Sequence, residues 1–64
     1  MRTYTLTIDT EKRVATINAY DNGELYITYR TNELTDAEME EMDYYTSNDI
    51  ADYLRTSGDY YVVK

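Results

Sequence analysis

The sequence predicts an α+β fold, in which a three-stranded antiparallel β-meander is covered on one face by one or two acidic helices. Three observations predict it. Apolar and polar side chains alternate with a period of two through the first 30 residues, which is typical of strands with two unlike faces. A complete helix start signal follows at Thr35. The excess negative charge falls entirely in residues 31–64. At 64 residues, the chain is expected to form one domain, residues 1–64, near the lower size limit for a self-sufficient core.

The middle strand of the expected meander comprises residues 14–20, and alternating segments lie before and after it. A four-residue turn at 10–13 joins the first two strands. A two-residue Asn22-Gly23 turn would mix the polar and apolar faces of the next pair, so a three-residue loop with Gly23 in the left-handed conformation is predicted instead. The resulting apolar rows are Tyr4–Ala19–Leu25, Leu6–Ile17–Ile27 and Ile8–Ala15–Tyr29.

The first helix is predicted from its start signal. Thr35 is the expected N-cap, Glu38 completes a capping box, and Leu34 and Met39 are spaced as a hydrophobic staple. Met39 and Met42 then face the sheet.

A second short helix is expected after a break, with Ser47 or Asn48 as its N-cap, because apolar side chains recur there at helical spacing. One kinked helix is the alternative. The last segment, residues 60–63, has the composition of a strand. It either pairs with an edge of the sheet as a short fourth strand or forms a packed tail.

The composition argues against several classes of function. The chain has no cysteine and no histidine, which removes thiolate chemistry, the usual general base and the commonest metal ligands. We therefore expect no enzymatic activity, no cofactor and no metal site. No apolar run approaches the roughly 20 residues that span a bilayer, and the N-terminus lacks an apolar signal segment. A cytoplasmic protein without a membrane partner is expected.

The negative charge is concentrated in the helical half. The net charge of -7 argues against direct nucleic-acid binding through a basic footprint. Acidic and basic residues cancel in residues 1–30, whereas residues 31–54 hold eight carboxylates and no basic side chain. Asp36, Glu40 and Asp43 form one exposed stripe, and like charges at this spacing repel by about 0.2–0.5 kcal/mol per pair. The acidic helix is either a solvated face that prevents aggregation or a ligand for a basic groove.

Carboxylates interleaved with tyrosines make up this acidic half: Glu33, Asp36, Glu38, Glu40, Glu41, Asp43, Asp49 and Asp52, with Tyr44, Tyr45 and Tyr53. In size, composition and charge layout the chain resembles small acidic inhibitors, encoded by phages and mobile elements, that block restriction or CRISPR nucleases by mimicking DNA. The resemblance implies a non-enzymatic inhibitor that binds the basic nucleic-acid-binding site of a target enzyme. The partner-binding residues expected from it are Glu33, Asp36, Glu40, Glu41, Asp43, Tyr44, Asp49 and Asp52.

The outer face of the sheet offers an alternative function. Its threonine-rich pattern is ordinary for exposed strands, but Tyr20 and Tyr26 are expected to lie on it with Arg30. Tyrosine is enriched at protein interfaces. The alternative is therefore a small interaction or accessory module that works through Tyr20 and Tyr26, most simply as a homodimer.

Overall fold

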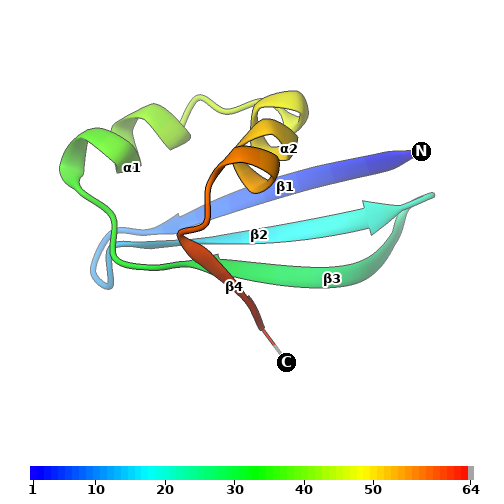
Figure 1. The fold of residues 1–64 in the computed structure, drawn as a ribbon, viewed down its shortest axis with the longest axis horizontal. Coiled ribbons are helices and arrows are strands. Elements are labelled where there is room, and N and C mark those ends of the chain that lie inside the picture. Colours follow the sequence, from blue (N-terminus) through cyan, green and yellow to red (C-terminus); the bar gives the residue numbers. More distant parts are fainter. Residues whose placement is uncertain (64) are drawn as a thin grey trace.

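The alternating side chains form four strands in a computed structural model that describes residues 1–63. They make an antiparallel meander in the order β1-β2-β3-β4, and two helices between β3 and β4 pack on one face of it (Figure 1). The predicted α+β class is confirmed, and the last segment is a fourth strand paired with β3. The elements are β1 (Arg2–Asp9), β2 (Val14–Asp21), β3 (Glu24–Thr31), α1 (Asp36–Met42), α2 (Ser47–Thr56) and β4 (Tyr60–Val63).

The first hairpin has the predicted register. Its turn is closed by a hydrogen bond of 2.8 Å from the Arg13 N–H to the Asp9 carbonyl. The Asp9 carboxylate also accepts from the N–H groups of Glu11 and Lys12, each at 3.0 Å. Arg13 adopts a left-handed conformation, with φ 59°. The predicted apolar pairs are present: Tyr4 with Ala19, Leu6 with Ile17 and Ile8 with Ala15.

The predicted length of the second turn is wrong, although Gly23 has the predicted positive φ. Asp21 pairs directly with Glu24, so the turn contains only Asn22 and Gly23, whose φ angles are 51° and 85°. Two consecutive residues with positive φ match the right-handed twist of the flanking strands, which favours the two-residue turn.

A β-bulge after this turn restores the separation of polar and apolar faces. Tyr20 lies opposite Leu25 while Ala19 lies opposite Ile27, so Tyr26 is an extra residue in β3. The predicted cross-strand pairs between β2 and β3 are consequently shifted. Ile17 rather than Ala15 pairs with Tyr29. Leu25, which was predicted to join an apolar row, has 56% of its surface exposed.

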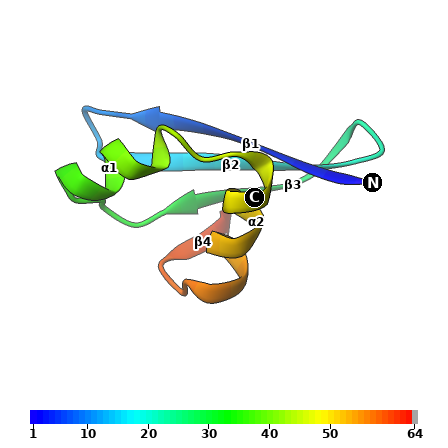
Figure 2. The ribbon, with the colours of Figure 1, turned by 90° about the horizontal axis from the view of Figure 1, so that it is seen from above.

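The core lies between the sheet and the helical half of the chain. Figure 2, seen from above, shows that the helices leave the β2–β3 turn end of the sheet uncovered. The methionines of α1 face the sheet as predicted. The buried side chains are Ala15, Ile17 and Ala19 from β2, Thr31 from β3, and Leu34, Met42 and Ile50 from the helical half.

Helix α1 begins with the predicted capping box. The Glu38 N–H donates to the Thr35 hydroxyl at 3.2 Å, and the Thr35 N–H donates to the Glu38 carboxylate at 3.0 Å. Leu34 and Met39 belong to the same apolar cluster, as the staple predicts.

Helix α2 is a separate helix, but its predicted N-cap is wrong. Thr46 is the N-cap rather than Ser47 or Asn48, because Asp49 three residues on completes a second capping box. Ser47 has a different role: its hydroxyl accepts a hydrogen bond of 3.1 Å from the Tyr4 N–H in β1. The start of α2 is thereby attached to the edge of the sheet.

Four tyrosine rings run from β3 through β4 to the helical layer. Tyr29 packs edge-on against Tyr60 with ring centroids 5.3 Å apart, and Tyr60 lies 6.2 Å from Tyr53. Tyr53 in turn lies 6.4 Å from Tyr45. Burial raises the pKa of Tyr29, Tyr45 and Tyr53 above the ordinary value for a phenol. These rings therefore favour the protonated state in the folded protein.

We expect the free energy of unfolding to fall above about pH 10. Because the folded-state pKa of each of these phenols is raised, the stability linked to them is fully present below the unfolded value and is lost as the pH rises through the folded value. Urea denaturation followed by circular dichroism from pH 7 to 12 measures this loss. Tyr53→Phe should reduce this loss relative to wild type. An alkaline loss in Tyr53→Phe equal to that of wild type would contradict the assignment.

Candidate functional site

The eight predicted partner-binding residues fall into two groups in the structure. The side chains of four residues form ion pairs or hydrogen bonds with other groups of the protein. The other four side chains form no ion pair within residues 1–63. The first group comprises Glu33, Asp36, Asp49 and Asp52. The second comprises Glu40, Glu41, Asp43 and Tyr44, which we call the acidic end of α1.

Arg13 neutralises the start of α1. Its Nη2 lies 2.7 Å from the Asp36 carboxylate, and its Nε lies 4.0 Å from that of Glu33. The same Nε donates to the Leu34 carbonyl at 3.1 Å, while the Arg13 carbonyl accepts from the Leu34 N–H at 2.7 Å. Arg13 thus fastens the β1–β2 turn to the segment entering α1. Glu33 and Asp36 belong to this connection. Their partner Arg13 could not be recognised from the sequence, because the charges of residues 1–30 cancel.

The acidic residues of α2 also have internal roles. The Asp49 carboxylate accepts from the Thr46 N–H at 2.9 Å and from its hydroxyl at 3.0 Å. These hydrogen bonds to the charged form lower the pKa of Asp49. Asp52 forms an ion pair with Arg55 one turn later. Both carboxylates therefore contribute to helix structure, as the capping box already indicated for Asp49.

The acidic end of α1 is the unneutralised part of the predicted surface. Glu40, Glu41 and Asp43 are exposed, and no Lys or Arg of the described residues lies within ion-pair distance of them. Tyr44 follows directly, with 78% of its surface exposed. Three carboxylates and one tyrosine are thus presented together at the point where α1 ends.

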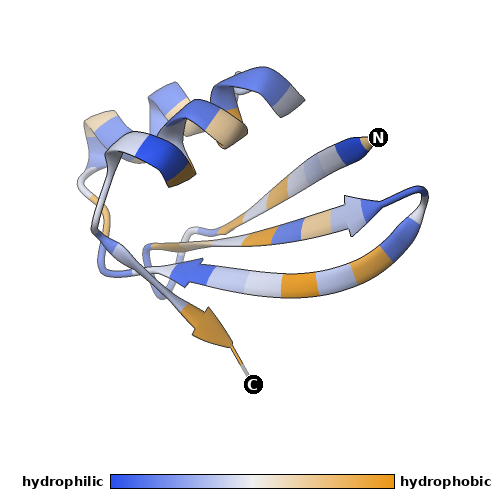
Figure 3. Ribbon diagram, turned by 45° about the vertical axis from the view of Figure 1, so that its right-hand side comes forward, coloured by the Kyte–Doolittle hydropathy of each residue, from blue (hydrophilic) through white to orange (hydrophobic). Residues whose placement is uncertain are grey.

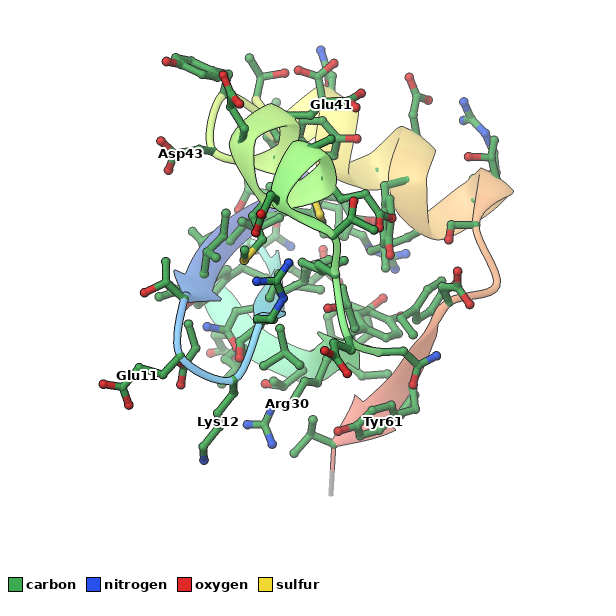
Figure 4. All side chains as sticks on the ribbon, turned by 90° about the vertical axis from the view of Figure 1, so that its left-hand side faces the viewer. Glu11, Lys12, Arg30, Glu41, Asp43 and Tyr61 are labelled. Carbon is green, nitrogen blue, oxygen red and sulfur yellow. The ribbon has the colours of Figure 1, made fainter. Side chains whose placement is uncertain are left out.

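Lys12 and Arg30 lie on a different side of the molecule from the acidic end of α1. In Figure 4, Glu41 and Asp43 project from the helical layer, whereas Lys12 and Arg30 project from the opposite side, beneath the sheet. The molecule therefore presents a charge asymmetry in space as well as along the chain, and a basic partner would be steered towards the helical side.

A groove runs between α1 and the end of β1. Half-buried Ile8 and Met39 supply apolar contacts, and Thr10 lies beside them. Glu40 and Asp43 line the same groove. It combines apolar and acidic groups, a combination suited to a side chain with an aliphatic stem and a cationic head.

The two tyrosines predicted on the outer sheet face do not form one patch. Tyr20 lies opposite Leu25. Tyr26 sits at the bulge and packs beneath the Arg2 guanidinium, 4.8 Å from the ring centroid. Both helices lie over the other face, so the outer face has no covering layer among residues 1–63 (Figure 1). Sequence reasoning missed the exposed apolar side chains near it, Leu25 and Tyr61.

Comparisons with protein-family models, with curated proteins and with solved structures find no match for this chain. Within residues 1–63, neither helix is long and apolar enough to span a membrane. Within the same residues, no three acidic side chains gather into a group that could hold a metal ion.

Proposed function

We propose that the protein is a non-enzymatic acidic inhibitor that binds the basic nucleic-acid-binding site of a target enzyme by mimicking DNA. The target class is a restriction or CRISPR nuclease in the cytoplasm of a bacterial cell. The observation that supports this proposal is the acidic end of α1, where Glu40, Glu41 and Asp43 stand exposed without a neutralising cation among the described residues.

Helix stability gives no reason for these charges. The C-terminal end of a helix carries partial negative charge, so an acidic side chain there costs about 0.3–1 kcal/mol. Glu40, Glu41 and the C-cap Asp43 all lie at this end, and the last turn of α1 has no basic residue to offset them. A surface that lowers the stability of its own helix is better explained by binding than by folding.

A basic groove would compensate this unfavourable arrangement. Groups of exposed carboxylates imitate phosphates in charge, and complementary fields accelerate association and select partners. Tyr44 adds an exposed amphipathic ring beside them, a side chain that is enriched at interfaces. The proposed contact surface is therefore smaller than the full acidic half of the sequence, because Glu33, Asp36, Asp49 and Asp52 have internal partners.

The test compares two triple charge reversals in partner binding. The first replaces Glu40, Glu41 and Asp43 with lysine. The matched control, Glu11→Lys, Glu24→Lys and Asp59→Lys, changes exposed acidic residues elsewhere and shifts the net charge from -7 to -1 in the same way. Each protein is immobilised, and captured proteins from a nuclease-treated bacterial lysate are identified with and without added DNA.

We expect wild type and the control to capture a nucleic-acid enzyme that DNA displaces, and the α1 variant to lose it by at least about tenfold, or 1.4 kcal/mol. Affinity should also fall steeply with salt, because screening weakens interactions between exposed charges. Equal capture by both triple variants would show that the acidic end of α1 is only a solvated face and does not bind the partner.

A second candidate function is an interaction module that acts through the outer sheet face as a homodimer. It is favoured by the exposed apolar side chains Leu25 and Tyr61, which add to Tyr20 on a sheet face that no helix of the described residues covers. In Figure 3 the C-terminal part of β4 is hydrophobic. The two candidate functions differ in the oligomeric state of the isolated protein, since only the second requires a dimer.

A further inference from the structure

Strand β1 is an open edge of the sheet. It stands at one end of the strand order, and no strand of residues 1–63 pairs with its outer side. Natural edge strands are usually protected by lysine, proline or a bulge. Residues 3–10 contain no Lys, Arg or Pro, and the pairing of β1 with β2 is regular throughout. This edge is therefore able to accept a further strand.

The backbone groups available on this edge are those of Leu6 and Ile8. The Tyr4 N–H points away from β2, because it donates to the Ser47 hydroxyl at 3.1 Å. Backbone direction alternates along a strand, so the N–H and C=O groups of Leu6 and Ile8 point to the same outer side. The start of α2 covers the edge at Tyr4 and leaves the next two positions open.

A strand added here would direct alternate side chains into the groove beside α1. Directly opposed residues of neighbouring strands project from the same face. A residue opposite Ile8 therefore projects towards Met39, Glu40 and Asp43, which line the groove with Ile8. A lysine or arginine in that position can lay its aliphatic stem on Ile8 and Met39 and place its charge between the two carboxylates. In Figure 4, Asp43 projects on the side where β1 lies.

We infer that the β1 edge and this groove together bind an extended basic segment of the partner protein, which adds to the sheet as an antiparallel strand beside β1. This inference rests on the proposed function, since it specifies how a basic partner meets the acidic end of α1. Strand addition supplies affinity through main-chain hydrogen bonds, and the groove selects the cationic side chain.

A second copy of the chain fits this edge less well. Antiparallel pairing of two β1 strands about Leu6 would set Ile8 of one copy opposite Tyr4 of the other, and the Tyr4 N–H is already bonded to Ser47. Each copy also carries a net charge of -7, so the copies repel. A short basic segment over Leu6 and Ile8 meets neither obstacle.

The probe is the blocked heptapeptide acetyl-Thr-Lys-Thr-Lys-Thr-Lys-Thr-amide, titrated into the ¹⁵N-labelled protein with amide exchange read by NMR. We expect exchange at Leu6 and Ile8 to slow at least tenfold at saturation. Methylating the three lysine amide nitrogens, which would face β1, should abolish this protection. Methylating the inner threonine amides, which would face solvent, should leave it in place.

Paired neutralisations test the groove. Glu40→Gln with Asp43→Asn should weaken peptide binding about tenfold, or 1.4 kcal/mol, whereas Glu24→Gln with Asp59→Asn removes the same charge at exposed positions outside the groove and should change it less than threefold. Unchanged exchange at Leu6 and Ile8, or equal binding of both methylated peptides, would overturn strand addition. If both methylated peptides bind wild type but not the Glu40→Gln, Asp43→Asn variant, strand addition is wrong, whereas the acidic binding surface and the proposed function are retained. A dimer whose Leu6 and Ile8 amides are protected without peptide would also overturn the inference.

Discussion

Replacing Ile17 with alanine is expected to lower the free energy of unfolding by about 2–5 kcal/mol. Ile17 lies at the centre of β2 between Leu6 and Tyr29, and none of its surface is exposed. Truncation removes its apolar contacts and leaves a cavity that the sheet cannot close. A domain of this size has a total stability of only about 3–10 kcal/mol, so the variant should be partly unfolded at 37 °C. Urea denaturation followed by circular dichroism measures the change.

Leu25→Ala is the matched control for this substitution. It also shortens an apolar side chain in the sheet, but Leu25 is 56% exposed because of the bulge in β3. We expect a loss below about 1 kcal/mol, because little buried area disappears. If Leu25→Ala were as damaging as Ile17→Ala, Leu25 would belong to the core and the bulged register would be wrong.

Replacing Thr31 with valine is expected to lower the free energy of unfolding by about 1–3 kcal/mol. Thr31 is 1% exposed, and its hydroxyl oxygen accepts a hydrogen bond of 2.9 Å from the Ala15 N–H. Valine preserves the shape and favours strands, but it leaves this buried N–H without an acceptor. The same urea denaturation measures the loss.

Thr31→Ser separates the hydrogen bond from the packing. Serine keeps the hydroxyl and loses one methyl group, which is worth about 0.8 kcal/mol. Amide exchange at Ala15 should remain slow in Thr31→Ser and become faster in Thr31→Val. A Thr31→Val protein as stable as wild type, with slow exchange at Ala15, would show that another group satisfies this amide.

The parts of the fold that could be predicted from the sequence depend on neighbouring residues. The first hairpin follows from alternation and a four-residue turn, and α1 follows from the Thr35 and Glu38 capping box. The second hairpin could not be predicted in detail, because turn length determines the register only where the strands pair without a bulge. The bulge at Tyr26 breaks that link, since one unpaired residue changes the phase of β3 after a two-residue turn.

The candidate site could be predicted only as a set of charges. Counting carboxylates identified the acidic half, but it could not tell which of them are neutralised. The deciding partner of Asp36 and Glu33 is Arg13, which is distant in sequence and reaches them only when the β1–β2 turn lies beside the start of α1. The groove likewise combines Ile8 with Glu40, a pairing that no local pattern indicates.

The place of both helices between β3 and β4 has a consequence for the order of folding. The two hairpins of β1, β2 and β3 join neighbours in sequence, so each closes a short loop at low entropic cost. Pairing of β4 with β3 must instead bring Tyr60 to Thr31 across the whole helical half. Such long-range contacts form slowly. We therefore expect β1, β2 and β3 to pair early and β4 to join last, completing the row of tyrosine rings as it docks.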